Sequence, residues 1–208
     1  PAMSLQYITV PDRLPENKMR LYATKVVNII GGPGCEKSMV SAAIILHMYL
    51  RNQSVETVPD YAKTLVWQQR HEGLKNQYQL AQRQFDMINT LDGQVKFLVN
   101  ECALPQLLYY NENYENNVCD VEKTRKQILA WYHQHQNINI VVKRSDKKYV
   151  HTGRFQTEEE AHEIDRKMRE LLVREGIQYT EVEPNVQAIH NFATQIIEGH
   201  GVDHPAAD

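Results

Sequence analysis

The fold is decided by Lys25-Val-Val-Asn-Ile-Ile30 and by the stretch that follows it directly, Gly31-Gly-Pro-Gly-Cys-Glu-Lys-Ser38. A short β-branched run closed by glycines predicts a buried parallel strand that ends in a tight turn. The apolar residues of segment 38–51 then predict a helix that packs against the sheet. A strand, a glycine-rich loop and a helix in this order form the setting in which phosphate-binding loops occur.

The loop matches the P-loop pattern G-x-x-x-x-G-K-[ST] at Gly31, Lys37 and Ser38, but Glu36 stands where the second glycine belongs. In an intact loop the backbone N–H groups wrap the phosphates, the lysine reaches the outer phosphates and the hydroxyl holds Mg²⁺. We therefore predict binding of ATP and Mg²⁺, with a plain strand-to-helix turn as the alternative. The predicted nucleotide-binding residues are Gly31, Gly32, Pro33, Gly34, Cys35, Glu36, Lys37, Ser38 and, after a later strand, Arg144.

Glu36 is expected to impair this loop in two ways. Glycine at a tight phosphate turn often provides a backbone angle or a close approach that other residues do not tolerate. A carboxylate beside a triphosphate also repels it, by roughly 3 kcal/mol for unit charges about 5 Å apart at an effective dielectric near 20. That repulsion corresponds to about a hundredfold loss of affinity.

Short apolar runs alternate with helical segments along the rest of the chain. This alternation predicts an α/β fold with a five-stranded parallel sheet, helices on both faces and the 25–30 strand at its centre. The further predicted strands are 55–58, 94–99, 137–142 and 178–182, the further helices are 60–92, 121–136, 157–175 and 184–198, and 107–117 is predicted to be an irregular insertion.

The predicted domain organisation is simple. One domain spans residues 21–198, with a small lid at about 143–156, between an N-terminal arm (1–20) and a mobile tail (199–208). We interpret Pro1 and Ala2, which precede Met3, as a vector scar.

Composition narrows the class of protein further. The net charge of −3 argues against a broad nucleic-acid-binding face. No apolar run is long enough to predict a membrane span. Cys35, Cys102 and Cys119 form no CxxC pair, which predicts reduced thiols, no zinc site and a cytoplasmic setting.

Several segments together resemble the phage and bacterial family of P-loop ATPase and kinase domains that includes nicotinamide riboside kinase-like domains and phage nucleotide or DNA-base kinases. The resemblance covers residues 25–198, and its most distinctive stretch is Gly153-Arg-Phe-Gln-Thr-Glu-Glu-Glu-Ala161. The other stretches that carry it are 26–38, Pro59-Asp-Tyr-Ala-Lys63 and Phe97-Leu-Val-Asn-Glu-Cys-Ala-Leu-Pro105. It implies a P-loop NTPase fold that binds ATP and Mg²⁺, a small-molecule or DNA-base acceptor and, for a phage-encoded chain, a place in the host cytoplasm.

The chain departs from the family pattern at four positions. Glu36 replaces a glycine and Met39 replaces a threonine. Asp60 replaces a glutamate and Glu101 replaces an aspartate. These two positions keep their negative charge, while the length of the side chain changes by one methylene.

Four residues are the predicted catalytic set: Lys37, Asp60, Glu101 and Arg154. Lys37 would neutralise the outer phosphates, and Ser38 would bind Mg²⁺, the alternative being a solvated helix start. Asp60 would orient or deprotonate an acceptor hydroxyl, or it caps a helix. Glu101 would act as a base or hold Mg²⁺ through water, or it is an ordinary loop acid.

A basic stretch follows the fourth predicted strand. Arg144, Lys147, Lys148 and Arg154 are predicted to form a cationic lid over the transferring phosphoryl group, or a solvated surface. Three tyrosines, Tyr109, Tyr110 and Tyr114, are candidates to stack on a base, with core packing as the alternative use.

Two main functional hypotheses follow from the sequence. The first is an ATP-dependent phosphotransferase whose acceptor is a nucleoside, a nucleotide or a modified DNA base. The second is an inactive relative in which Glu36 blocks ATP and the chain serves as a binding or partner subunit. A plain NTPase switch is a third reading, and a homo-oligomer is compatible with all of them.

Overall fold

The computed structural model describes residues 18–145 and 157–199, which form a five-stranded sheet in the order β2-β3-β1-β4-β5. Every strand pairing is parallel, and β1 lies between β3 and β4. The predicted fold class, with the first strand at the centre, is therefore confirmed. The strands are β1 (Lys25–Ile30), β2 (Val55–Val58), β3 (Phe97–Asn100), β4 (Gln136–Val142) and β5 (Thr180–Val182).

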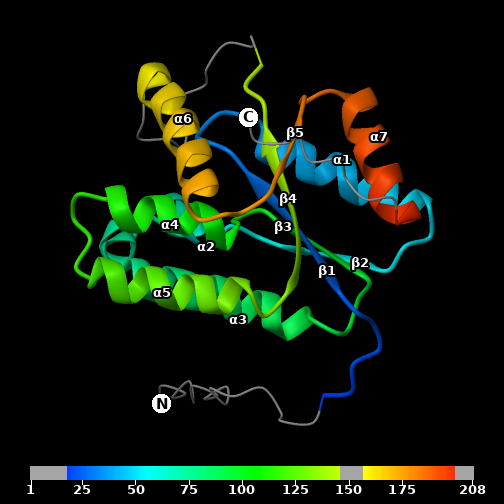
Figure 1. The fold of residues 1–208 in the computed structure, drawn as a ribbon, viewed down its shortest axis with the longest axis horizontal. Helices are drawn as coiled ribbons and strands as arrows, with labels where there is room; N and C mark the ends of the chain where they lie inside the picture. The colour runs from blue at the N-terminus through cyan, green and yellow to red at the C-terminus, as the bar shows by residue number, and fades with distance from the viewer. Residues whose placement is uncertain (1–17, 146–156, 200–208) are drawn as a thin grey trace, which may run out of the picture.

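Helices cover both faces of the sheet because β1 is apolar on both sides. Val26 and Ile30 of β1 pack into one buried cluster, whereas Val27 and Ile29 pack into another. On the first face lie α3 (Gln77–Leu91), α4 (Leu104–Asn113), α5 (Val121–Tyr132) and α6 (Glu158–Arg174), and on the second lie α1 (Lys37–Leu50) and α7 (Val186–Glu198), as Figure 1 shows.

The predicted helix over 60–92 is wrong as one element. The structure has α2 (Tyr61–Trp67), a short 3₁₀ turn η1 (His71–Lys75) and then α3. The backbone breaks at Gln69, whose φ is 56°, and a new helix starts where the side chain of Asn76 accepts a hydrogen bond from the N–H of Gln79. The glutamine-rich sequence continues the helical pattern, but these local signals end one helix and begin another.

The predicted irregular insertion at 107–117 is also wrong over most of its length. Residues 104–113 form α4, which has Pro105 in its first turn, where the missing N–H costs nothing. Leu104, Leu107 and Leu108 bury one side of this helix in the core. The Tyr, Asn and Glu residues that suggested an irregular segment lie on a helix held by its apolar face.

The remaining boundaries shift by a few residues. The strands predicted at 94–99 and 178–182 begin at Phe97 and Thr180, and α6 begins with the predicted capping box, in which Thr157 and Glu160 each accept from the other's backbone N–H. Residues 1–17 of the predicted arm, most of the predicted lid and all of the predicted tail except Gly199 lie outside the described residues. Within the part of the chain that the structure describes, no helix is long and apolar enough to cross a membrane.

Candidate active site

The glycine-rich loop lies between the carboxyl end of β1 and the start of α1, as the sequence predicts. Its glycines are needed because side chains pack closely against the loop backbone. A Cβ on Gly31 would lie 2.3 Å from Cys35 Sγ, and one on Gly32 would lie 2.3 Å from Asp165 Oδ1. Gly34 has a φ of 77°, in the left-handed region that favours glycine. The backbone therefore has the tight curvature that a phosphate cradle requires.

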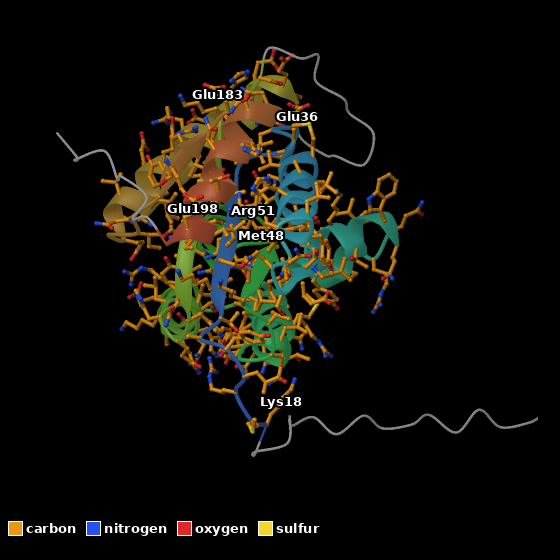
Figure 2. All side chains as sticks on the ribbon, turned by 90° about the vertical axis from the view of Figure 1, so that its right-hand side faces the viewer. Lys18, Glu36, Met48, Arg51, Glu183 and Glu198 are labelled. Carbon is orange, nitrogen blue, oxygen red and sulfur yellow. The ribbon has the colours of Figure 1, made fainter. Side chains whose placement is uncertain are left out.

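Glu36 adopts the backbone conformation for which a P-loop uses glycine. Its φ and ψ are 67° and 29°, and it is the residue from which α1 begins. Its half-buried carboxylate accepts a hydrogen bond from Ser145 Oγ at 3.0 Å, at the end of β4. Figure 2 shows Glu36 and Glu183 both at the end of the molecule opposite Lys18, where the carboxyl ends of the parallel strands lie. The carboxylate is thus held at the loop by the neighbouring strand end.

Lys37 lies across the loop rather than away from it. Its Nζ donates to the carbonyl oxygen of Gly31 at 2.9 Å and to that of Gly32 at 3.3 Å. The ammonium is therefore already positioned on the concave side of a phosphate-binding turn. The neighbouring Ser38 accepts a hydrogen bond at its Oγ from Lys63 Nζ at 3.1 Å.

Two buried side chains hold the first N–H groups of the loop. Gln106 Oε1, from α4, accepts from the N–H of Gly31 at 3.2 Å. Asp165 Oδ1, from α6, accepts from the N–H of Gly32 at 2.8 Å. Sequence analysis missed both residues. Asp165 had a detectable signal, because it is a charged residue on the otherwise apolar stripe of an amphipathic helix.

Arg144 is held beside the loop by the carboxylate of Asp165. Its Nε donates to Asp165 Oδ2 at 2.7 Å, and both side chains are about nine-tenths buried. Its guanidinium lies against Gly32, since a Cβ there would be 3.2 Å from Arg144 Nη2. The structure therefore brings Arg144 beside the loop, and contact with a bound phosphate stays a prediction.

A cavity of about 380 Å³ opens beside the loop on the side of α2, α3 and α4. Asp60 and Glu101, which follow β2 and β3, both line it together with Lys37 and Ser38. The predicted acids and the loop therefore share one cavity. The rest of its wall is largely apolar or aromatic and includes Val66, Leu74, Leu80, Leu107, Tyr110 and Tyr114. Tyr109 does not line the cavity and is buried in the core.

Asp60 caps a helix and faces the cavity at once. Its Oδ1 accepts from the N–H of Lys63 at 3.0 Å, so the predicted alternative of a helix cap is present in the structure. A buried amide network fixes this corner: Gln84 accepts from the N–H of Tyr61 at 3.2 Å and donates to Asn100 Oδ1 in β3 at 2.9 Å. Capping uses one position on the carboxylate and the Cys102 thiol also bonds to it, and since each carboxylate oxygen has two lone pairs, acceptor positions remain for a ligand.

The two cysteines nearest the site are protonated thiols. Burial raises the pKa of Cys102 well above its usual range, and the adjacent Asp60 carboxylate raises that pKa further. Burial likewise raises the pKa of Cys35. Because the thiolate is the nucleophilic form, neither Cys102 nor Cys35 is suited to nucleophilic catalysis.

The arrangement fits a metal that is bound mainly by its substrate. In residues 18–145 and 157–199 there is no cluster of three or more His, Cys, Asp or Glu side chains that could hold a metal ion by themselves. Mg²⁺ usually takes only one or two protein oxygens and completes its shell with phosphate and water. Ser38 and Glu101 in one cavity provide a set of that kind. The other lid residues, Lys147, Lys148 and Arg154, lie outside the described residues.

Comparison with known proteins agrees with this geometry. A family model described as an AAA domain matches residues 26–188. A crystal structure of NadR protein in complex with NAD and AMP-PNP superposes with a TM-score of 0.62 at 13% identity, over 89% of this chain and 52% of that one. A second, of NadR protein in complex with NR, gives a TM-score of 0.57 at 14% identity, over 89% and 54%.

The chain spans about half the length of these two structures, and no curated protein sequence matches it. At such identities the solved structures show the fold alone. The family match covers most of the chain and contains the glycine-rich loop, both acids and Asp165. The chain therefore belongs to this AAA-domain family and has a P-loop NTPase fold.

Proposed function

We propose that the chain is an ATP-dependent phosphotransferase, impaired by Glu36, whose acceptor is a nucleoside, a nucleotide or a modified DNA base. The observation that carries this proposal is the cavity, because it joins the phosphate loop to two carboxylates and to an apolar, aromatic wall. A hydrolase needs only water beside the loop. A cavity of about 380 Å³ that contains Tyr110 and Tyr114 suits a flat ring of an acceptor.

The proposed roles follow from position. An acceptor hydroxyl attacks the terminal phosphorus of ATP, the bond from that phosphorus to the bridging oxygen breaks, and ADP leaves with the bond's electron pair. Asp60 receives the hydroxyl proton on its oxygen that does not cap α2. Lys37 neutralises charge on the outer phosphates, and Ser38 and Glu101 would hold Mg²⁺. When bound, this metal offsets charge on the phosphate oxygens.

The two NadR structures are complexes with NAD and AMP-PNP and with NR, so that protein binds both a nucleotide and NR. For this chain we propose nucleotide on the loop and acceptor in the cavity. Residues 143–156, between β4 and α6, are proposed as the lid. Cytoplasmic placement and a homo-oligomer stay predictions from sequence.

Asp60→Asn tests the proton-accepting role without removing the helix cap, because asparagine caps helices as well as aspartate does. We expect the rate of phosphate transfer to fall by about 10²- to 10⁴-fold, as for loss of a general base. ADP release would be measured with ATP and a panel of nucleosides, nucleotides and DNA that carries a hydroxylated base. Thermal unfolding provides the control for folding. Transfer by Asp60→Asn at the unchanged rate would remove Asp60 from the mechanism.

A second candidate function is that of an inactive binding or partner subunit. Glu36 favours it, because a carboxylate in the left-handed position of the loop is held there by Ser145. The two proposals differ in ATP binding. Isothermal titration with Mg-ATP, on the chain and on Glu36→Gly, separates them: no heat from the chain with Glu36 and clear binding by the variant would favour the inactive subunit.

A further inference from the structure

A second cation reaches the phosphate loop from a different helix. Lys63, in α2, donates from its Nζ to Ser38 Oγ at 3.1 Å, which joins positions 25 residues apart in the sequence. Ser38 is the loop hydroxyl assigned above to Mg²⁺. The ammonium of Lys63 therefore lies at the point where the outer phosphates and the metal would meet the loop.

The backbone of Lys63 is fixed, whereas its side chain is exposed. Asp60 Oδ1 accepts from the N–H of Lys63 at 3.0 Å, and Gln84 Nε2 donates to the carbonyl oxygen of Pro59 at 2.9 Å. These bonds hold the start of α2 against α3. The exposed lysine stem has several rotatable bonds, so its ammonium can move a short distance from this fixed base at little cost.

Lys63 supplies one of the positive charges on a cavity wall that is negative overall. Among the described residues that line the cavity, two are cationic, Lys37 and Lys63, and three are anionic, Glu36, Asp60 and Glu101. Two positive and three negative charges sum to −1, and the sum without Lys63 would be −2. A triphosphate brings several more negative charges. Lys37 alone would then face both the phosphates and the three carboxylates.

We propose that Lys63 is a phosphate-binding residue of this site, which turns from Ser38 to the terminal phosphate when a nucleoside triphosphate occupies the loop. The inference rests on the proposed function. An ammonium has three donors, and once Lys63 leaves Ser38 all three can bind phosphate oxygens. Because an ammonium and Mg²⁺ repel each other, Lys63 would not share Ser38 Oγ with the metal and would bind the phosphate instead.

The test compares two nucleotides on matched variants. AMP-PNP and AMP would be titrated calorimetrically into the full chain, Lys63→Gln, Lys63→Arg and Lys126→Gln, in Mg²⁺ and in EDTA. Lys126 is an exposed lysine of α5 and serves as the charge-matched control. We expect Lys63→Gln to weaken AMP-PNP binding by about 10- to 100-fold, the effect of losing a charged hydrogen bond. AMP binding should change less than about twofold, and Lys63→Arg should retain most of the AMP-PNP affinity.

The other outcomes distinguish a wrong role for Lys63 from a wrong proposed function. If Lys37→Ala weakens AMP-PNP binding and Lys63→Gln does not, the role of Lys63 is wrong while the phosphate loop stands. An equal loss for AMP and AMP-PNP would mean that Lys63 supports α2 instead of a phosphate, which overturns the proposal. If neither the chain with Glu36 nor Glu36→Gly binds AMP-PNP at all, the proposed function fails and Lys63 loses its role with it.

Discussion

Replacing Glu36 with glycine is the most informative single change, because it acts on the charge and on the backbone of the loop. With φ at 67°, the residue has an angle that costs a non-glycine residue about 1–2 kcal/mol. Glycine relieves this strain but adds about 0.5–1 kcal/mol of chain entropy to the unfolded state. The hydrogen bond from Ser145 is lost as well. These terms nearly offset one another, so we expect the free energy of unfolding to change little.

The affinity for ATP should change much more than the stability. Unit charges about 5 Å apart at an effective dielectric near 20 repel by roughly 3 kcal/mol. Since Ser145 holds the half-buried carboxylate at the loop, solvent screens this repulsion only in part. We therefore expect Glu36→Gly to bind Mg-ATP at least about tenfold tighter than the chain with Glu36, with about a hundredfold as the upper limit.

Glu36→Gln is the matched control for this prediction. It removes the charge, keeps the left-handed residue and offers Ser145 an amide oxygen to bond. Titration of Mg-ATP into the three chains then separates charge from backbone: a gain shared by both variants is electrostatic, and a gain confined to glycine is conformational. Equal affinities in all three chains would refute the conclusion that Glu36 impairs the loop.

Two further predictions concern the lid and the effect of pH. Arg154→Ala should lower the rate of single-turnover phosphate transfer by about 10³-fold, because a guanidinium can donate two parallel hydrogen bonds to the phosphoryl group. Lys148→Ala should lower that rate much less. If both changes had equally mild effects, the lid prediction would be wrong and residues 143–154 would be interpreted as a solvated loop. Hydrogen bonding by Arg125 lowers the pKa of Glu175, a side chain only 5% exposed. The resulting stability is present above the ordinary pKa of glutamate and is lost as the pH falls through the lowered pKa. Glu175→Gln should therefore flatten the acid limb of unfolding free energy against pH, and Glu122→Gln, at an exposed partner of Arg125, should leave that limb nearly unchanged.

Sequence reasoning succeeded where a local pattern decides the structure. The β-branched run 25–30 and the glycines after it determine a central strand and its loop, and the capping box at Thr157 determines where α6 starts. It also placed Asp60 and Glu101 near the loop, because both follow strands of a parallel sheet. These are short-range signals combined with one rule of topology.

The failures share a different physical origin. Helical periodicity in 60–92 did not reveal the left-handed backbone at Gln69, and the polar residues of 107–117 concealed a helix that its buried leucines stabilise. The bonds from Gln106, Asp165 and Lys63 to the loop cross large sequence distances. Contacts of that kind are products of packing, and no local pattern contains them.

Hydrogen bonds from two helices and from Lys37 hold the glycine-rich loop in place. Gln106 from α4 and Asp165 from α6 hold successive N–H groups, and Lys37 binds the carbonyls of the same two glycines. The loop is therefore held in shape by the protein's own hydrogen bonds, so the proposed nucleotide would not have to order it. Asp165 lies two turns into α6, and it also holds Arg144, which lies two residues after β4. One carboxylate therefore joins the phosphate loop, the chain that leaves β4 and the helix that follows the proposed lid.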